Sequence, residues 1–309
     1  MDFVTADHPD QGDQADRADR SLDPKLSLLF ALADDELIMG HRHSEWTGWA
    51  PHIEEDLAFS SIAQDEMAHA RLLYQLIGAL TADDVDRLAF GREPHQYRNA
   101  WLCERPNGDW GYSVARQYLY DTADEVRIGA LAESAWKELA DLVPVIQLEE
   151  RYHLDHARAW FDRLATGPSV TARQKLADGL SSAIGEAVAL FEPLPGEEDL
   201  VEEGVLPRSN EDLLSVWLDG LGRDLERASL DFVLERHTRA GEMVPTSAGE
   251  IEGGDEPFVA PGLTRRDERW IHEGGFAGAG GRWGRHSDDF QAGWEEMTNL
   301  YRTHPGATW

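Results

Sequence analysis

The sequence contains a single cysteine, Cys103, among its 309 residues. One cysteine excludes a disulfide framework, a cysteine-based zinc site and a cysteine-ligated iron–sulfur cluster. No uninterrupted apolar run reaches the roughly 20 residues that a membrane-spanning helix needs. The N-terminus is acidic, unlike the basic and then apolar start of a signal peptide. We therefore expect a soluble, cytoplasmic protein that has no membrane partner.

Positive charge is also scarce, because 28 Lys and Arg residues face 59 Asp and Glu residues, a formal net charge of −31. That charge would repel a phosphate backbone, so ordinary nucleic-acid binding is excluded. Only three of the basic residues are lysines (Lys25, Lys137 and Lys175). Few lysine stems and many carboxylates give a heavily hydrated surface, which favours a halophilic protein in a saline cytoplasm. A mildly acidic mesophilic protein is the alternative.

Strand-type alternation never exceeds a few residues, and no internal repeat is found, whereas helical periodicity covers most of the chain. The fold class is therefore all-α, a bundle of long helices with a C-terminal helical appendage. The expected helices are Asp23 to Gly48, Pro51 to Leu80, Tyr112 to Leu139, Leu142 to Ala165, Ser169 to just before Pro193, Glu211 to Arg239, and Asp288 to Tyr301.

Four regions follow from this pattern. Residues 1–20 are polar, acidic and non-periodic, which predicts a disordered N-terminus. Residues 21–240 form the helical bundle. Residues 241–285 are rich in glycine, but their spacing matches no phosphate-binding loop, so they are expected to be a linker. Residues 286–309 are expected to form a docking helix.

Two predicted helices carry the same Glu-x-x-His motif, once as residues 66–69 and once as residues 150–153. Residues three apart lie on one helix face, so each pair can present two ligands to one point. Each pair falls within an apolar seam of its helix, that is, among apolar residues that recur at alternating steps of three and four. On the second helix the seam is Phe59, Ile62, Glu66, His69, Leu73, Leu76 and Leu80. On the fourth helix it is Val143, Ile146, Glu150, His153, Ala157, Trp160 and Leu164. An ionised carboxylate there is costly unless it is paired or bound to metal. The motifs therefore predict a metal centre; buried Glu–His hydrogen bonds without metal are the alternative.

A ferritin-like di-metal centre takes one further carboxylate from each of two other helices. On the third helix two sets of inward-facing residues are possible, and Asp121 belongs to both. The first helix offers Glu36 and Glu45, which are about half a turn out of phase, and periodicity slightly favours Glu36. Carboxylate and imidazole ligands without thiolate suit iron or manganese.

Several short segments carry a further signal: His43-Ser44-Glu45, Ala50-Pro51, Gln64 to His69, and Asp121 followed by Glu150 to His153. In these segments the chain, over residues 24–240, resembles the catalytic A-type large subunit of the bacterial phenylacetyl-CoA epoxidases (ring 1,2-epoxidases), which are multicomponent di-iron monooxygenases. The resemblance implies Glu45 as the ligand from the first helix, with Glu36 in reserve. The implied metal ligands are Glu45, Glu66, His69, Asp121, Glu150 and His153.

A second set of segments is similar to the C-type large subunit of the same enzymes: Glu45-Trp46, Phe90 to Glu93, Glu104 to Gly108, Ala115 to Tyr118, Arg151 to Leu154, and the tail from Glu296 to Trp309. In C-type subunits the ligands on the second and fourth helices are typically replaced, and no metal is held. This sequence departs from that pattern, because it keeps both Glu-x-x-His pairs.

The resemblance implies a subunit of an enzyme that converts phenylacetyl-CoA, or a related acyl-CoA, to its ring 1,2-epoxide in aerobic phenylacetate degradation. Its catalytic carboxylates would be Glu66 and Glu150, its cofactors two Fe ions (Mn is possible), and its co-substrate O₂. Because the chain has no nicotinamide, flavin or iron–sulfur motif, electrons would come from a separate reductase. Further expected partners are the A-type and small B-type subunits.

Two alternatives remain open. One is a non-catalytic C-type subunit that braces a separate catalytic A-type subunit. The other, of a different class, is a ferritin-like iron-storage protein.

Overall fold

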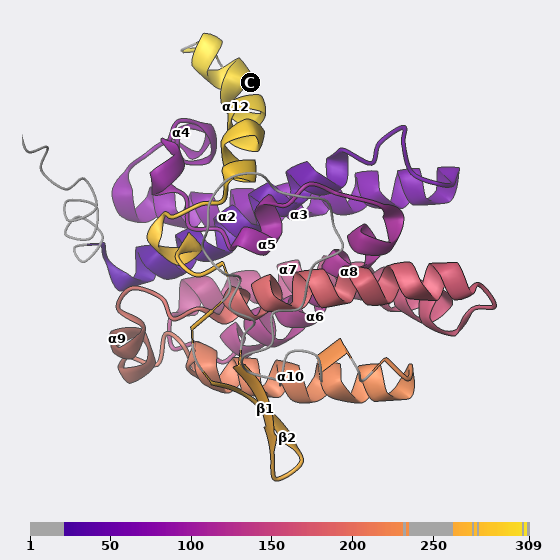
Figure 1. Ribbon diagram of the computed structural model, residues 1–309. Helices are drawn as coiled ribbons and strands as arrows, with labels where there is room; N and C mark the ends of the chain where they lie inside the picture. Colours follow the sequence, from indigo (N-terminus) through magenta and orange to yellow (C-terminus); the bar gives the residue numbers. More distant parts are fainter. Residues whose placement is uncertain are drawn as a thin grey trace, which may run out of the picture.

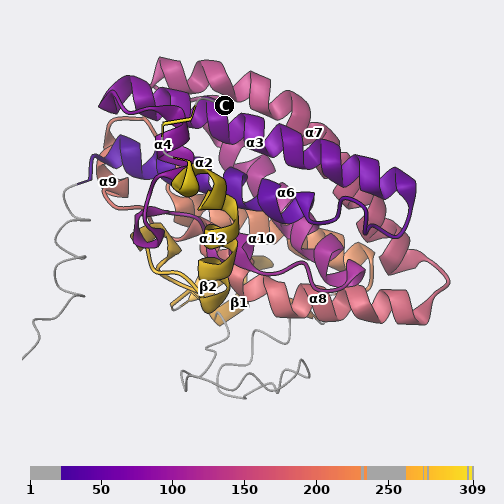
Figure 2. The ribbon, with the colours of Figure 1, turned by 90° about the horizontal axis from the view of Figure 1, so that it is seen from above.

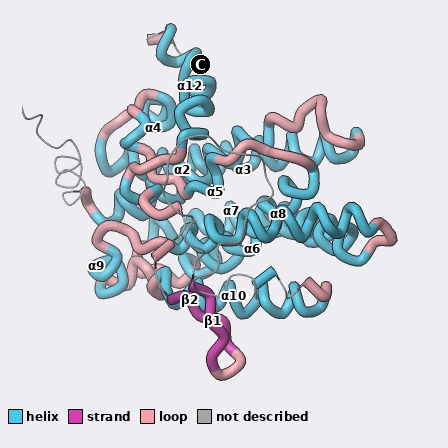
Figure 3. The backbone as a smooth tube through the Cα atoms, in the orientation of Figure 1, coloured by secondary structure: helices cyan, strands magenta, loops and turns pink. Residues whose placement is uncertain are grey.

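The computed structural model describes residues 22–230, 233–234, 262–273, 275–276, 278–304 and 306–307. Long helices stack in layers, with α2 and α3 above α6, α7 and α8, and with α10 below them (Figure 1). In the described residues the only strands are the two of a small hairpin, β1–β2, which projects from the α10 side (Figure 3). The expected all-α, ferritin-like fold class is confirmed.

The first layer consists of α2 (Pro24–Ser44) and α3 (Ile53–Thr81). Helix α2 begins where Asp23 accepts a hydrogen bond from the amide of Lys25 and Pro24 takes the first helical position. The two helices run antiparallel and pack closely at Gly40, where a Cβ atom would lie 3.1 Å from the carbonyl oxygen of Ala63. This close approach brings the inner faces of α2 and α3 together at the level of the candidate site.

The second layer consists of α6 (Trp110–Leu131), α7 (Lys137–Thr166) and α8 (Val170–Val188). Side chains of Asp109 and Ser169 cap α6 and α8 by accepting hydrogen bonds from backbone amides. Viewed from above, α7 runs beside α3 (Figure 2). The inner faces of α2, α3, α6 and α7 thus surround one common core.

The remaining elements cover the ends and the lower face of this bundle. They are α4 (Val85–Phe90), α5 (Trp101–Glu104), α9 (Glu197–Glu202), α10 (Asn210–Arg227), β1 (Gly262–Arg266), β2 (Arg269–Glu273), α12 (Asp288–Thr303), and 3₁₀ turns at Pro94–Gln96, Ala189–Phe191 and Gly281–Trp283. Helix α12 stands away from the bundle axis (Figure 1). No helix in the described ranges is both long and apolar enough to cross a membrane.

Three expected helix boundaries are wrong. The third helix ends at Leu131 rather than Leu139, and α7 starts at Lys137 and continues through Pro144. The sixth helix ends at Arg227, and the chain then turns at Ser229, which has a φ of 54°. Apolar periodicity continued past both helix ends, so it could not mark them; residues 235–239 lie outside the described residues.

The expected linker at 241–285 is also wrong where the structure describes it. Residues 262–273 pair as the β1–β2 hairpin, in which Leu263 is fully buried. Arg282, in the same expected linker, is 1% exposed inside the bundle. The expected disordered segment 1–20, residues 241–261 and Trp309 lie outside the described residues.

Candidate metal centre

The four inner helices direct acidic and imidazole side chains into the core of the bundle. Each of these side chains belongs to a residue that is at most 8% exposed. They are Glu36 from α2, Glu66 and His69 from α3, Asp121 from α6, and Glu150 and His153 from α7. Five of the six are residues that the sequence singled out as the ligand set; the sixth, Glu36, was the reserve.

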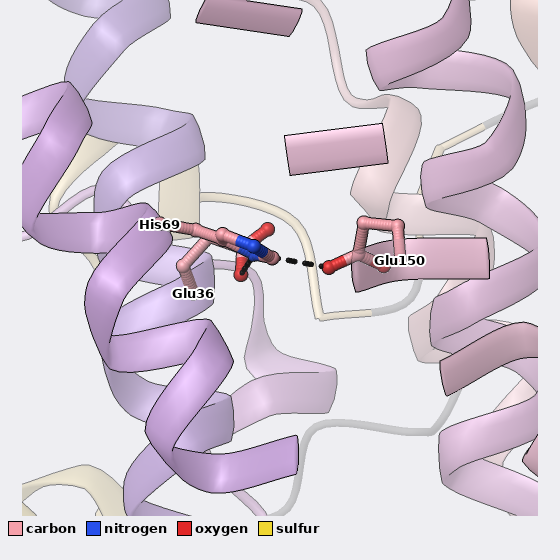
Figure 4. Close-up of side chains that lie close together, drawn as sticks. All are labelled: Glu36, His69 and Glu150. Carbon is pink, nitrogen blue, oxygen red and sulfur yellow. Dashed lines mark ion pairs between the residues drawn. The ribbon is translucent and has the colours of Figure 1, made fainter. Parts of the chain in front are cut away.

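Glu36, His69 and Glu150 form the tightest group. One potential ligand atom from each lies within 4.8 Å of the others. Nδ1 of His69 is 3.1 Å from Oε1 of Glu150 and 3.4 Å from Oε2 of Glu36. The three side chains converge from α2, α3 and α7 (Figure 4). This spacing suits a single cation held between them.

The other predicted residues lie around Glu150 and Glu66. Nδ1 of His153 is 3.3 Å from the same Oε1 of Glu150. Glu66 meets a buried histidine, His43, whose Nδ1 is 2.9 Å from Oε2 of the carboxylate. Asp121 is 1% exposed, and neither of its carboxylate oxygens has a hydrogen-bond partner among the described residues. This half of the cluster is as deeply buried as the group around His69, and it holds the two unpartnered oxygens of Asp121.

The structure does not bring Glu45 to this cluster. Glu45 follows the last residue of α2, and its side chain is 40% exposed. It accepts hydrogen bonds from Arg42, at 2.7 Å, and from Asn107, at 3.1 Å. The nine residues between Glu36 and Glu45 correspond to about 13 Å along a helix and half a turn around it. Of the two glutamates, the structure therefore brings Glu36, and not Glu45, into the buried cluster.

The buried polar atoms of the cluster that have no hydrogen-bond partner show whether its residues fit a metal ion. A buried polar atom without a partner costs about 1–3 kcal/mol, so several in one place need an explanation. Among the described residues, these buried cluster atoms have no hydrogen-bond partner: Oε2 of Glu36, Oε1 of Glu66, Nδ1 of His69, both Oδ atoms of Asp121, Oε1 of Glu150 and Nδ1 of His153. Oxygen and imidazole nitrogen donors of this kind suit iron or manganese. The residues fit such a metal.

Two further carboxylates hold the histidines from outside. Nε2 of His69 is 2.8 Å from Oε2 of Glu149, and Nε2 of His153 is 3.3 Å from Oδ2 of Asp65. Each outer acid directly precedes the glutamate of one Glu-x-x-His motif and contacts the histidine of the other. Such contacts fix the orientation of a ligating imidazole. Sequence reasoning missed Asp65 and Glu149, although the acid before each motif was a readable signal.

Burial is the main cause of the raised pKa values of three carboxylates in the cluster. Burial, reinforced by the charge of Glu150, raises the pKa of Glu36 to about 8 and that of Asp121 well above its ordinary value. Burial also raises the pKa of Glu66 to about 8. Without a cation, these groups therefore favour the protonated form. A divalent cation would replace protons in this cluster when it binds.

Glu150 behaves in the opposite way. Burial alone would raise its pKa, but hydrogen bonding and charge from His153 and His69 lower it to about 2. Burial opposes the charged form of both imidazoles, yet Glu150 raises the pKa of His69 to about 11 and that of His153 to about 10. Glu150 is therefore the anion at the centre of the cluster.

The fold and the cluster together define a class, the helical bundles that carry two Glu-x-x-His helices and additional core carboxylates. Comparison with known proteins is more specific. The family described as phenylacetic acid catabolic protein matches residues 9–243. The C subunit of the 1,2-phenylacetyl-CoA epoxidase of Escherichia coli (strain K12) is 32% identical over 213 residues, which cover 68% of this chain and 84% of that protein. The chain belongs to the phenylacetic acid catabolic protein family.

Proposed function

We propose that this chain is a metal-bearing subunit of a multicomponent phenylacetyl-CoA epoxidase, which forms the ring 1,2-epoxide of phenylacetyl-CoA or a related acyl-CoA. The family match and the relative named for that enzyme support the reaction and the existence of partner subunits. The single observation that carries the metal-bearing role is the buried cluster of unpaired carboxylate and imidazole atoms. Four carboxylates and two imidazoles would be a costly core without a cation.

Six side chains would hold two iron ions, with manganese as the alternative: Glu36, Glu66, His69, Asp121, Glu150 and His153. Bound there, the iron pair would supply the reduction of O₂ and the transfer of one oxygen atom to the aromatic ring. Electrons would come from a separate reductase, and a catalytic A-type subunit and a small B-type subunit are the further expected partners.

The residues of the chain itself prepare this chemistry. Glu149 and Asp65 bind the Nε2 atoms of the two histidines, so that both Nδ1 atoms face Glu150. His43 holds one oxygen of Glu66 and leaves the other free inside the core. Low exposure of the six cluster residues and of His43 keeps water away from the cluster and strengthens each electrostatic contact, whereas the side chains of Glu149 and Asp65 are 41% and 35% exposed.

A second candidate function is a bracing subunit that supports a separate catalytic subunit. The observation that favours it is the likeness, over 68% of this chain, to a protein named as the C subunit of its enzyme. The resemblance of the sequence to C-type subunits, which hold no metal, points the same way. Retention of the complete acid and histidine cluster is the observation against it.

Reconstitution with the partner subunits separates the two functions. If this chain carries the chemistry, Glu150→Ala should abolish epoxide formation in a complex that still assembles. Assembly is measured alongside turnover, because removing the anion that pairs with two buried histidines costs about 3–5 kcal/mol of stability. Asp155→Ala, an exposed position on the same helix, is the matched control and should keep full turnover. Unchanged turnover in an assembled Glu150→Ala complex would assign the chain to bracing. In that case, truncation from residue 288 onwards should disrupt assembly instead.

A further inference from the structure

Arg282 is a fully buried cation contributed by the C-terminal segment, which we define as residues 278–304. The backbone approaches the bundle closely at this point, because a Cβ atom on Gly281 would lie 2.3 Å from the carbonyl oxygen of Asn99. Nη1 of Arg282 donates to the carbonyl oxygen of Arg98 at 2.9 Å, and Nη2 donates to that of Leu190 at 3.0 Å. The glycine next to Arg282 thus permits deep insertion of the guanidinium group.

The guanidinium group of Arg282 forms a two-pronged ion pair with Asp35 on α2. Nη1 lies 2.9 Å from Oδ1 and Nη2 lies 2.8 Å from Oδ2 of that carboxylate, across a separation of 247 residues in the chain. Asp35 also accepts hydrogen bonds from Nη1 of Arg127, at 2.9 Å, and from the amide of Ala100, at 2.8 Å. The thiol of Cys103 adds a weaker contact with Oδ1 at 3.6 Å. Asp35 is therefore a fully paired buried anion, and Arg282 provides two of its five donors.

This network borders the candidate metal centre. Asp35 directly precedes Glu36 on α2. Arg127 connects Asp35 to Asp124, because its Nε donates to Oδ1 of Asp124 at 2.8 Å. The other oxygen of Asp124 is buried without a hydrogen-bond partner among the described residues. The negative charge of Asp124 contributes to the raised pKa of Glu36. Two arginines thus neutralise two carboxylates that lie beside the cluster.

We propose that Arg282 is a positioning residue for the candidate metal centre, acting through Asp35 on the turn of α2 that carries Glu36. The inference rests on the proposed function in one respect, since it takes the cluster to bind a cation. Without Arg282, Asp35 keeps only the donors of Arg127, Ala100 and the Cys103 thiol, and its buried charge loses its two-pronged partner. A shift of this turn of α2 towards other donors would relieve the uncompensated charge, and it would take Glu36 away from His69 and Glu150.

The test uses Co²⁺ as the probe, titrated into the full-length chain after metal removal, with affinity and visible absorption bands recorded. Arg282→Met should weaken Co²⁺ binding about tenfold and change the absorption bands, which report the geometry of the ligands. Arg302→Met is the matched control: Arg302 lies in the same segment but pairs with Glu93 at the surface, and its variant should behave like the wild type. Arg282→Lys, which keeps the charge, should recover part of the affinity.

A double-mutant cycle shows whether Arg282 acts through Asp35. In an Asp35→Asn background, Arg282→Met should change Co²⁺ affinity by less than about threefold, because the partner charge is already gone. Wild-type affinity and spectrum in Arg282→Met, or an undiminished loss in the Asp35→Asn background, would overturn the inference and leave the proposed function standing. A wild-type chain that binds no Co²⁺ would overturn both. If Arg282→Met does not fold, Arg282→Lys gives the same comparison within the cycle.

Discussion

Glu36 and Glu45 have contrasting environments although both belong to the region of α2. Glu36 is 1% exposed and lies 3.4 Å from Nδ1 of His69, whereas the Glu45 side chain is 40% exposed and pairs with Arg42. A buried carboxylate without a hydrogen-bonded partner gains far more from a cation than a solvated one does. The two residues therefore form a matched pair for testing which acid of α2 binds metal.

Replacement of each acid by its amide should give opposite results. Glu36→Gln should lower the affinity for Fe²⁺ or Mn²⁺ by about tenfold or more, because the neutral amide cannot balance the charge of the cation. Glu45→Gln should leave binding unchanged. Equilibrium dialysis followed by elemental analysis, expressed per chain, measures both. Equal binding by wild type and Glu36→Gln, or a loss in Glu45→Gln, would contradict the geometry described above.

The buried members of the candidate site could be predicted from the sequence except for this one position, whereas the outer acids Asp65 and Glu149 were missed. Glu66, His69, Glu150 and His153 could be placed because their helices have a narrow apolar seam that fixes the inward face. Helix α2 is buried on most sides, with Asp34, Asp35 and Glu36 consecutive and all at most 1% exposed. Three buried acids in a row leave no amphipathic pattern, so periodicity alone could not decide between the two glutamates.

At the scale of elements, the β1–β2 hairpin is held to α10 by a closely fitted contact of Trp270, beside ion pairs of Arg265 with Glu226 and of Arg269 with Asp219. Trp270 of β2 is 6% exposed, and its amide donates to Oδ1 of Asp219 at 3.0 Å. A Cβ atom on Gly222 of α10 would lie 2.5 Å from Nε1 of the Trp270 indole. A glycine is therefore required at this position for steric reasons, whereas a Cβ atom on Gly220 would lie 3.9 Å from its nearest neighbour, a nitrogen of Arg223.

These two glycines predict opposite effects of the same substitution. Gly220→Ala should stabilise the protein by about 0.5–1 kcal/mol, because alanine favours the helix. Gly222→Ala gains the same propensity but forces the indole away, which should destabilise the protein by about 1–3 kcal/mol. Urea denaturation curves of both variants and the wild type measure the difference. A Gly222→Ala protein as stable as Gly220→Ala would mean that the hairpin does not pack against α10.

Helices were predictable from the sequence where local periodicity determines them, and segments held by distant partners were not. Helices α2 and α8 start where capping residues and proline predict a start, and α3 starts at Ile53, just after the expected Pro51. The hairpin and the turn around Arg282 depend on Gly222 of α10 and on Asp35 of α2, which lie far away in the sequence. A glycine-rich stretch with scattered polar residues has no local signal for such partners, so it resembles a linker until the whole chain is folded.

At the scale of the whole molecule, negative charge dominates. The chain has a net charge of −31 and only three lysines, although many of its arginines form ion pairs with acids in the described part of the chain. The excess carboxylates repel one another most strongly in the compact folded state. Repulsion between exposed charges extends over about 10 Å in 0.1 M salt but only about 3 Å in 1 M salt.

Stability should therefore rise with salt concentration. Between 0.1 M and 1 M KCl we expect a stabilisation of about 2 kcal/mol, which for a protein of 309 residues corresponds to an increase in Tm of about 3 °C. Differential scanning calorimetry of the protein in a KCl series measures this increase. Screening is nearly complete by about 1 M, so a gain that arises from charge repulsion should level off there, whereas exclusion of the salt from the surface would continue to stabilise the protein at higher concentrations. A Tm that stays constant from dilute buffer to molar KCl would count against a halophilic protein, because repulsion between its carboxylates would then contribute little to the free energy of unfolding.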